Sequence, residues 1–308
     1  MAGTFILSLD CEGKWGMADH LTADHHRWLT TARLRAAYEQ LLSLFDEYEI
    51  KATFAFVMAF LLSDRQQRAR EELFQDQEIE GKNWLTSFRI AQAEGDMEGW
   101  CMPELLEIVQ SHERHEIGCH SFSHLPLDED LVSAYVMRRE IGAAMSVAKE
   151  RRVSMHTFIY PRNRIGHVGI LAEAGFAGYR DRLTTRSGPI GRASSLLAEI
   201  NVLEKPQWPE SSRNDITVIP SGYFFNWRHG ARKLVPKTVT EHRWANLLSR
   251  AARDGGVVHL WLHPHNIISA PETFDVLRSV MRNVASHQAT GGITVKTQQE
   301  YCAGLAHR

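Results

Sequence analysis

The sequence lacks the features that mark several classes of protein. Its four cysteines are scattered along 308 residues, with no Cys-x-x-Cys pair and no disulfide-dense pattern. Its longest apolar run spans residues 52–62, well short of the roughly 18 residues that indicate a membrane span. We therefore expect free thiols in a reducing compartment and no membrane-spanning helix.

An excess of charge of one sign is also missing. The 35 Lys and Arg residues nearly cancel the 37 Asp and Glu residues, which leaves a formal net charge of −2. Such a balance gives no electrostatic footprint for nucleic acid or for an anionic membrane surface. The first residues, MAGTFILSLD, lack the basic start, apolar stretch and cleavage site of a secretory signal. We expect a cytoplasmic protein with no nucleic-acid partner.

What the sequence does have is a regular alternation of strand-like and helix-like segments, which predicts an α/β protein with a mostly parallel sheet. No G-x-G-x-x-G motif follows the first strand, so an irregular (β/α)7–8 barrel is favoured over an open doubly wound sheet. The expected strands are 4–10, 51–58, 116–121, 156–161, 178–181, 216–221, 257–263 and 292–297; the main expected helices are 34–48, 103–114, 129–150, 167–175, 240–256 and 271–287.

No domain boundary is evident, so we predict a single catalytic barrel over residues 1–308. Residues 63–102 interrupt the alternation with a charged run followed by a mixed segment, and we interpret them as a partly helical insertion. The insertion is either a lid over a binding site or a solvated face, and we favour the solvated face.

Polar side chains follow the ends of several predicted strands. In barrels of this class the catalytic groups come from the carboxyl ends of different strands. Here those ends supply a pair of acids, a pair of histidines, an arginine and a further histidine: Asp10 and Glu12, His120 and His124, Arg162, and His263. The strand ends therefore predict an active site.

The histidine pair lies in the segment HSFSH, residues 120–124. Its spacing puts both imidazoles on one face of a turn, within reach of one ion. Alone, this spacing is weak evidence in a chain with 16 histidines. Two histidines and a carboxylate, with a fourth position left to water, are however the ligands of a hydrolytic metal site.

The order of the motifs resembles that of the polysaccharide deacetylases of carbohydrate esterase family 4. The motifs are Asp-x-Glu after the first strand, His-Ser-x-x-His after a middle strand, a Pro-Arg motif after the next strand and Leu-x-His on a late strand. The resemblance covers roughly residues 4–297. It implies an irregular (β/α) barrel, a divalent metal that is usually zinc, and removal of an acyl group from an amino sugar.

The chain departs from the common family pattern at two motifs. Cys11 stands where the usual first motif has its metal-binding aspartate, and Asp10-x-Glu12 instead resembles a branch that spaces its acids by one residue. The usual arginine motif reads Arg-x-Pro, whereas YPRN puts Arg162 after Pro161.

The resemblance implies a role for each site residue. Asp10 is the expected general base, and Arg162 is expected to hold it ionised and oriented. Glu12, His120 and His124 are the expected metal ligands, while His263 is the candidate acid that protonates the departing amine. Each residue also has a plainer interpretation, such as a turn cap, a loop acid, a surface arginine or a core histidine.

Three further points stay open. A Cys11 thiolate is the rival to Glu12 as metal ligand, although alternation along a strand puts Asp10 and Glu12 on one face and Cys11 on the other. His265 is either a participant or a neighbour of the site. Trp15, Trp100 and Trp227 either stack on a sugar or simply pack.

Taken together, the sequence predicts a metal-dependent amide hydrolase that removes an N-acyl group, acetyl in our interpretation, from an amino sugar. The expected substrate is a nucleotide- or lipid-linked sugar or a surface polysaccharide precursor. The alternative is a non-catalytic relative that binds a sugar or a partner protein and has a decayed metal site.

Overall fold

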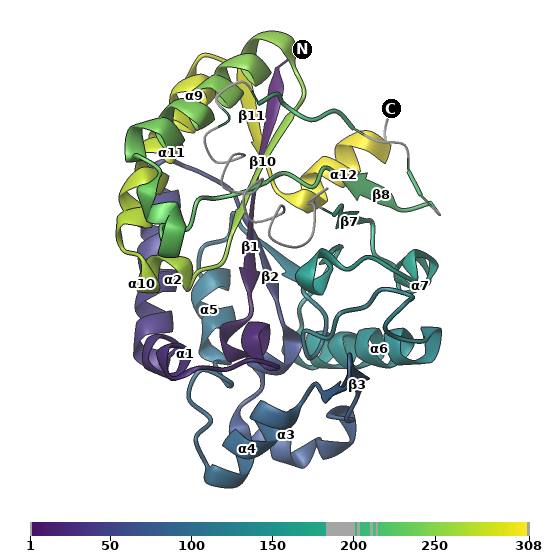
Figure 1. Cartoon of the computed structure of the whole chain (residues 1–308). Coiled ribbons are helices and arrows are strands. Elements are labelled where there is room, and N and C mark those ends of the chain that lie inside the picture. The colour runs from purple at the N-terminus through teal and green to yellow at the C-terminus, as the bar shows by residue number, and fades with distance from the viewer. Residues whose placement is uncertain (1, 183–200, 202–203, 210–211, 214, 307–308) are drawn as a thin grey trace.

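In a computed structural model of the chain, every neighbouring pair of described strands in the main sheet is parallel. The structure describes residues 2–182, 201, 204–209, 212–213 and 215–306. The strand order is β8-β7-β6-β5-β2-β1-β10-β9, and β11 also pairs with β1 (Figure 1). The strands are β1 (Gly3–Cys11), β2 (Thr53–Phe56), β5 (Glu116–Cys119), β6 (Thr157–Ile159), β7 (Gly178–Arg180), β8 (Thr217–Ile219), β9 (Tyr223–Phe224), β10 (Val257–Leu262) and β11 (Ile293–Lys296).

The sheet is curled like an irregular barrel, as the sequence predicts. β7 and β1 are four steps apart in the sheet, which is about 19 Å in a flat sheet. Nevertheless the Arg180 side chain of β7 bonds to Asp10 of β1 at 2.7 Å, so the sheet must close on itself. Among the described residues the edge strands β8 and β9 do not pair with each other, and the barrel is incomplete there.

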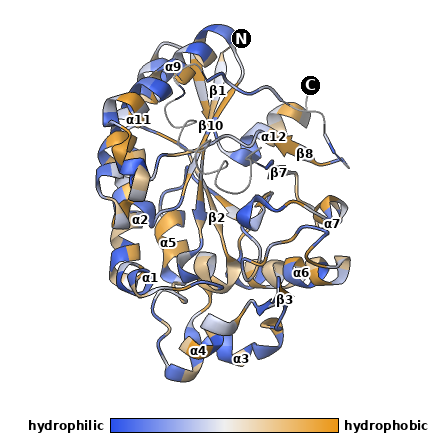
Figure 2. Cartoon of the chain, in the orientation of Figure 1, coloured by the Kyte–Doolittle hydropathy of each residue, from blue (hydrophilic) through white to orange (hydrophobic). Residues whose placement is uncertain are grey.

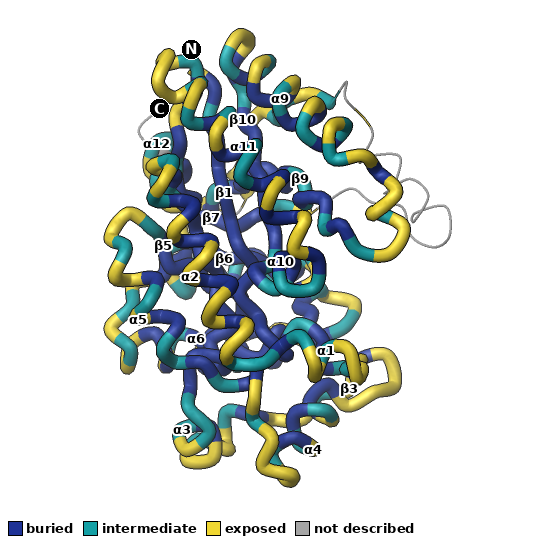
Figure 3. Tube along the Cα trace, turned by 90° about the vertical axis from the view of Figure 1, so that its left-hand side faces the viewer, coloured by how far each residue is buried: buried dark blue, intermediate teal, exposed yellow. Residues whose placement is uncertain are grey.

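Helices cover the outside of this sheet. Each helix carries both apolar and polar residues (Figure 2). The strands are mostly buried, and the exposed residues lie on the outer turns of the helices and on the loops (Figure 3). The α-helices are α1 (Ala23–Trp28), α2 (Thr31–Glu47), α3 (Asp64–Ala69), α4 (Thr86–Glu94), α5 (Glu104–Gln110), α6 (Ala134–Arg151), α7 (Val168–Glu173), α9 (Lys237–Asp254), α10 (Asn266–Ser269), α11 (Glu272–Ala289) and α12 (Gln298–Ala306). Short 3-10 helices are η1 (Gly13–Met17), η2 (Met58–Leu61), η3 (Glu71–Leu73), η4 (Pro161–Asn163) and η5 (Gly230–Leu234).

Residues 63–102 fold outside the main sheet, next to the carboxyl ends of its strands (Figure 1). They comprise α3, η3, the hairpin of β3 (Glu78–Ile79) with β4 (Lys82–Asn83), and α4. Trp84, which follows the hairpin, is buried and donates its Nε1–H to the carbonyl of Ser123 at 3.0 Å. The segment therefore supports the loop that carries the histidine pair.

The amino end of the barrel is closed by α12. A separate apolar cluster joins Ile6, Ile219 and Val257 of the strands to Tyr301 and Cys302 of that helix. In the described part of the chain, none of the helices has both the length and the apolar character that crossing a membrane requires.

Candidate active site

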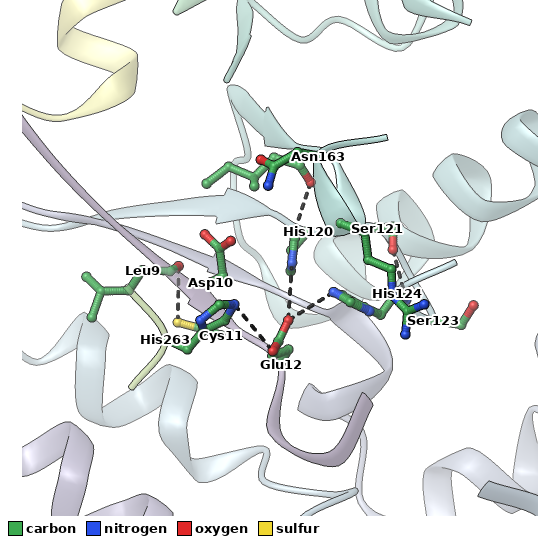
Figure 4. A network of polar contacts seen from close by, with 12 residues as sticks. Leu9, Asp10, Cys11, Glu12, His120, Ser121, Ser123, His124, Asn163 and His263 are labelled. Atoms are coloured by element: carbon green, nitrogen blue, oxygen red, sulfur yellow. Dashed lines mark hydrogen bonds and ion pairs between the residues drawn. The ribbon is translucent and has the colours of Figure 1, made fainter. Parts of the chain in front are cut away.

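The predicted site residues converge on one cavity at the carboxyl ends of the strands. β1 runs into Glu12, β5 into His120 and β10 into His263. These side chains, together with Asp10 and His124, line a cavity of about 400 Å³ (Figure 4). Residues brought together from such distant parts of the sequence form a site and not a local turn.

Glu12 lies at the centre of the cluster. Its Oε2 is 2.9 Å from Nε2 of His124 and 3.6 Å from Nε2 of His120, and one ligand atom from each of the three residues lies within 4.8 Å of the others. The carboxylate also fills the space beside Gly16, where a Cβ atom would approach Glu12 Oε1 to 2.1 Å. A side chain at position 16 would therefore displace the acid.

The donor set and its orientation fit a divalent cation. His120 contacts the carbonyl oxygen of Ile159 through Nδ1 at 2.8 Å, which makes Nδ1 the protonated nitrogen and leaves Nε2 as a lone-pair donor facing Glu12. Two neutral imidazoles and a carboxylate, all buried, are typical zinc ligands. These three residues would hold the metal.

The charge on Glu12 is stabilised where it lies. Burial by itself raises the pKa of this carboxyl, but the neighbouring side chains of His263, His124 and His120 outweigh it and hold the pKa well below its ordinary value. Glu12 is therefore ionised at neutral pH.

Asp10 is paired with Arg180, and both side chains are buried. The guanidinium donates from Nη1 to Oδ1 and from Nη2 to Oδ2, each at 2.7 Å, and lies 4.4 Å from the ring centroid of Trp261. Burial raises the pKa of Asp10, but the Arg180 charge and hydrogen bonds outweigh it, so the pKa lies below its ordinary value of 3.8. Such a carboxylate is fixed in direction and ready to accept a proton.

The expected contact of Arg162 with Asp10 is wrong. Arg162 lies at the cavity, but its guanidinium bonds to Asp19 and lies 4.7 Å from the ring centroid of Trp84. The chain turns sharply after β6, with left-handed φ angles of 55° and 54° at Arg162 and Asn163, and the arginine there reaches Asp19 and not Asp10. Arg180 takes the expected place beside Asp10.

Arg180 could have been found from the sequence by the rule already used for the other residues. It is the last residue of the short strand GYR, so it is a polar side chain at the carboxyl end of a predicted strand. The Pro-Arg motif drew attention to Arg162 instead.

Replacing Arg162 by glutamine is expected to have small effects. Its pair with Asp19 is partly exposed, at 34% and 21% of the two side chains, and such pairs contribute about 0–1 kcal/mol. Because Arg180 holds Asp10, we expect kcat/KM to fall by less than about tenfold. Denaturant titration and steady-state kinetics measure the two quantities, and a loss of kcat beyond about a hundredfold would give Arg162 a direct part in the reaction.

His263 and His265 form the opposite wall. Nε2 of His263 is 3.5 Å from Glu12 Oε1, and the two histidine rings stack at 5.0 Å. Burial, followed by the neighbouring His263, lowers the pKa of His265 to about 3, so His265 is neutral at physiological pH. Glu12, His263 and His265 form a second group with metal-binding geometry, but His263 is the more exposed, at 22% of its side chain against 1% and 4% for His120 and His124.

Cys11 points away from the cavity, as the strand alternation predicts. It is fully buried in the main core, with Sγ 3.5 Å from the carbonyl oxygen of Leu9. Burial is the main reason that the pKa of the thiol lies well above its ordinary value. Cys11 is therefore a core residue with a neutral thiol, on the face of β1 that points away from the cavity.

The three tryptophans separate into two groups. Trp15 and Trp100 are fully buried in the core and contact each other edge to face at 5.0 Å, so of the two alternatives these residues simply pack. Trp227 lines the cavity, as do Trp28 and Phe224, which the sequence analysis did not single out. These rings give the cavity an aromatic rim.

Comparison with known proteins places the fold. No family model and no curated protein matches the sequence. Among solved structures the chain is similar to one described as a polysaccharide deacetylase from Mycobacterium smegmatis, with 15% identity, a TM-score of 0.59, and 99% of this chain and 91% of that one covered. It is also similar to one described as a polysaccharide deacetylase from Pseudomonas aeruginosa PAO1, with 12% identity, a TM-score of 0.54 and coverage of 97% and 89%.

A third structure of the same fold is Puue allantoinase, with 11% identity, a TM-score of 0.53 and coverage of 97% and 88%. These likenesses confirm the predicted resemblance at the level of fold: the chain has the fold of the polysaccharide deacetylases. Because an allantoinase shares it, the fold alone does not specify the substrate.

Proposed function

We propose that the protein is a metal-dependent hydrolase that removes an N-acyl group, acetyl in the first instance, from an amino sugar. The observation that carries the proposal is the joint placement, in one cavity, of the Glu12–His120–His124 cluster and an ionised Asp10 held by Arg180. A cluster of metal ligands beside an oriented base is what metal-dependent amide hydrolysis requires.

Each residue has one task in this scheme. Glu12, His120 and His124 would hold the cation, and zinc suits two imidazoles and a carboxylate. When bound, the cation would polarise the amide carbonyl and acidify water. Asp10 accepts the proton of the attacking water because Arg180 fixes its carboxylate. His263, on the opposite wall, donates a proton to the nitrogen of the departing amine.

The choice of an amino sugar rests on two supports. The sequence motifs resemble those of polysaccharide deacetylases, and structures described by that name share the fold. The aromatic rim of Trp28, Phe224 and Trp227 offers apolar faces against which a sugar ring can stack. A nucleotide- or lipid-linked sugar, or a surface polysaccharide precursor, fits this proposal.

The Arg180–Asp10 pair removes one of the two supports of the non-catalytic alternative. That alternative rested on the two departures from the common motifs, and the Arg180–Asp10 pair supplies the contact that the displaced Arg162 does not make.

The proposal is tested by incubating the purified protein with acylated amino sugars and nucleotide sugars and measuring, by mass spectrometry, loss of the acyl mass. We expect turnover that stops on chelation and returns when zinc is added back. Elemental analysis of the same preparation should give about one divalent ion per chain. A protein that holds the ion and hydrolyses none of the acyl amides would contradict the proposal.

Replacing His263 by alanine is expected to remove most of the rate and leave the metal in place. Wild-type kcat/KM should be bell-shaped in pH, because Asp10 must be ionised and His263 protonated, and general acid catalysis typically contributes about 10²–10⁴-fold. The variant should lose the alkaline limb of the profile. Near-wild-type activity in this variant would remove His263 from the mechanism.

A further inference from the structure

Asn163 has no role in the scheme so far, yet it lines the catalytic cavity with Asp10 and His120. It ends η4, directly after β6, and Figure 4 places it beside those two residues. Asn163 and the preceding Arg162 both have left-handed φ angles, 54° and 55°. Asparagine tolerates this conformation better than most residues, and residues other than glycine in this conformation cluster at functional sites.

The orientation of the Asn163 amide follows from its neighbour. Nη2 of Arg180 lies 3.3 Å from Oδ1 of Asn163. A guanidinium only donates hydrogen bonds, so the atom that faces it must be the amide oxygen. Nδ2 therefore points away from Arg180, and within the described part of the chain it donates to no protein group. Two N–H donors remain for a molecule in the cavity.

We infer that Asn163 is a further catalytic residue, which donates an Nδ2–H hydrogen bond to the acyl oxygen of the substrate. The inference rests on the proposed function. As water adds to the carbonyl carbon, the C=O electron pair moves onto this oxygen, and the hydrogen bond stabilises the charge without transferring a proton. When the C–N bond breaks, the C=O bond re-forms and the amine takes its proton from His263.

The Arg180 guanidinium therefore orients two groups of the site. Arg180 holds the carboxylate of Asp10 and, through Nη2, also the oxygen of Asn163. The base that directs the water and the donor that meets the new charge keep a constant relative position, which is the preorganisation that makes such donors effective.

Two variants separate this role from a structural one. Asn163→Asp keeps an oxygen for Arg180 but replaces the donor nitrogen, whereas Asn163→Ala removes both contacts. We expect kcat to fall by about 10²–10³-fold in both variants, with KM and metal content little changed. If Asn163 only supports Arg180, Asn163→Asp will keep its rate and only Asn163→Ala will lose it, which would overturn the inference. Asn83→Asp makes the same chemical change on the exposed β3–β4 hairpin and serves as the matched control.

A binding measurement keeps the test independent of turnover. Acetate carries the oxygens that the reaction leaves on the acyl carbon, and calorimetry on the metal-loaded protein measures its affinity. We expect acetate to bind at least about tenfold more weakly to Asn163→Ala than to the wild type or to Asn83→Asp.

The outcomes distinguish the two proposals. Turnover that survives in Asn163→Ala overturns the inference and leaves the proposed function standing. If the wild type hydrolyses no acyl amide, the proposed function fails, and acetate affinity still decides the inference: weaker binding in Asn163→Ala supports the donor, whereas equal binding, or none to the wild type, overturns it.

Discussion

Replacing Arg180 by glutamine is expected to lower the free energy of unfolding at neutral pH by about 3–5 kcal/mol, the usual consequence of removing one partner of a buried ion pair. Asp10 would remain in a site where burial alone raises its pKa, now without the charge that offsets this effect. We also expect kcat/KM to fall by about 10²–10⁴-fold, because the base becomes protonated and loses its direction.

The pH dependence of the stability loss identifies its cause. In the wild type the pKa of Asp10 is depressed below 3.8, so the pair stabilises the fold above about that pH and the contribution disappears as the pH falls through the folded pKa. In Arg180→Gln the carboxyl prefers to be protonated, so its burial costs more as the pH rises. The difference between the two proteins should therefore be largest at neutral pH and should shrink toward pH 3 to 4.

A double variant provides the control. Asp10→Asn in the Arg180→Gln background removes the unpaired charge, so we expect it to recover most of the stability and none of the activity. Denaturant titrations of the metal-free proteins measure the first effect. Equal stability losses in Arg180→Gln and Arg162→Gln would contradict the assignment of the pair.

The sheet was largely predictable from sequence because its strands are buried on both faces. Segments such as VVHLWL of β10 are apolar at most positions, which is typical of parallel strands covered by helices. β9 was missed because Tyr223 and Phe224 alone make the strand, too short for any periodic pattern. α12 was missed as well. Its sequence, QQEYCAGLA, has little helical periodicity, and the helix is stabilised by packing against the amino end of the barrel.

The site could be predicted in part for a different reason. Carboxyl ends of parallel strands meet at one edge, so Asp10, Glu12, His120 and His263 could be grouped without a structure. Which arginine reaches Asp10 depends on the curl of the sheet and on the turn after β6. Neither is written in local sequence, and for this reason the motif indicated Arg162 while the fold brings Arg180 from four strands away.

Replacing Glu12 by alanine is expected to release the metal and abolish turnover, whereas replacing Cys11 by alanine should preserve both. Glu12 faces His120 and His124 across the cavity, and it is the acidic member of both groups with metal-binding geometry. Without it each group keeps only two imidazoles, too few for a hydrolytic zinc site. Cys11 lies on the other face of β1 among core residues, so its loss should cost about 1 kcal/mol of stability.

A Cys11 thiolate as the metal ligand would give the opposite result, and elemental analysis of the two variants tests this directly. If the thiolate bound the ion, Cys11→Ala would lose it and Glu12→Ala would keep it, and cobalt-loaded wild type would display a thiolate charge-transfer band. We expect no such band. The Cys11 thiol could reach the cavity only if the register of β1 shifted by one residue, and that shift would bury Asp10 against the helices. Glu12→Gln adds a further distinction, because it preserves the packing against Gly16 but removes the charge. Metal loss in that variant would show that metal binding depends on the carboxylate itself and not on the volume of the side chain.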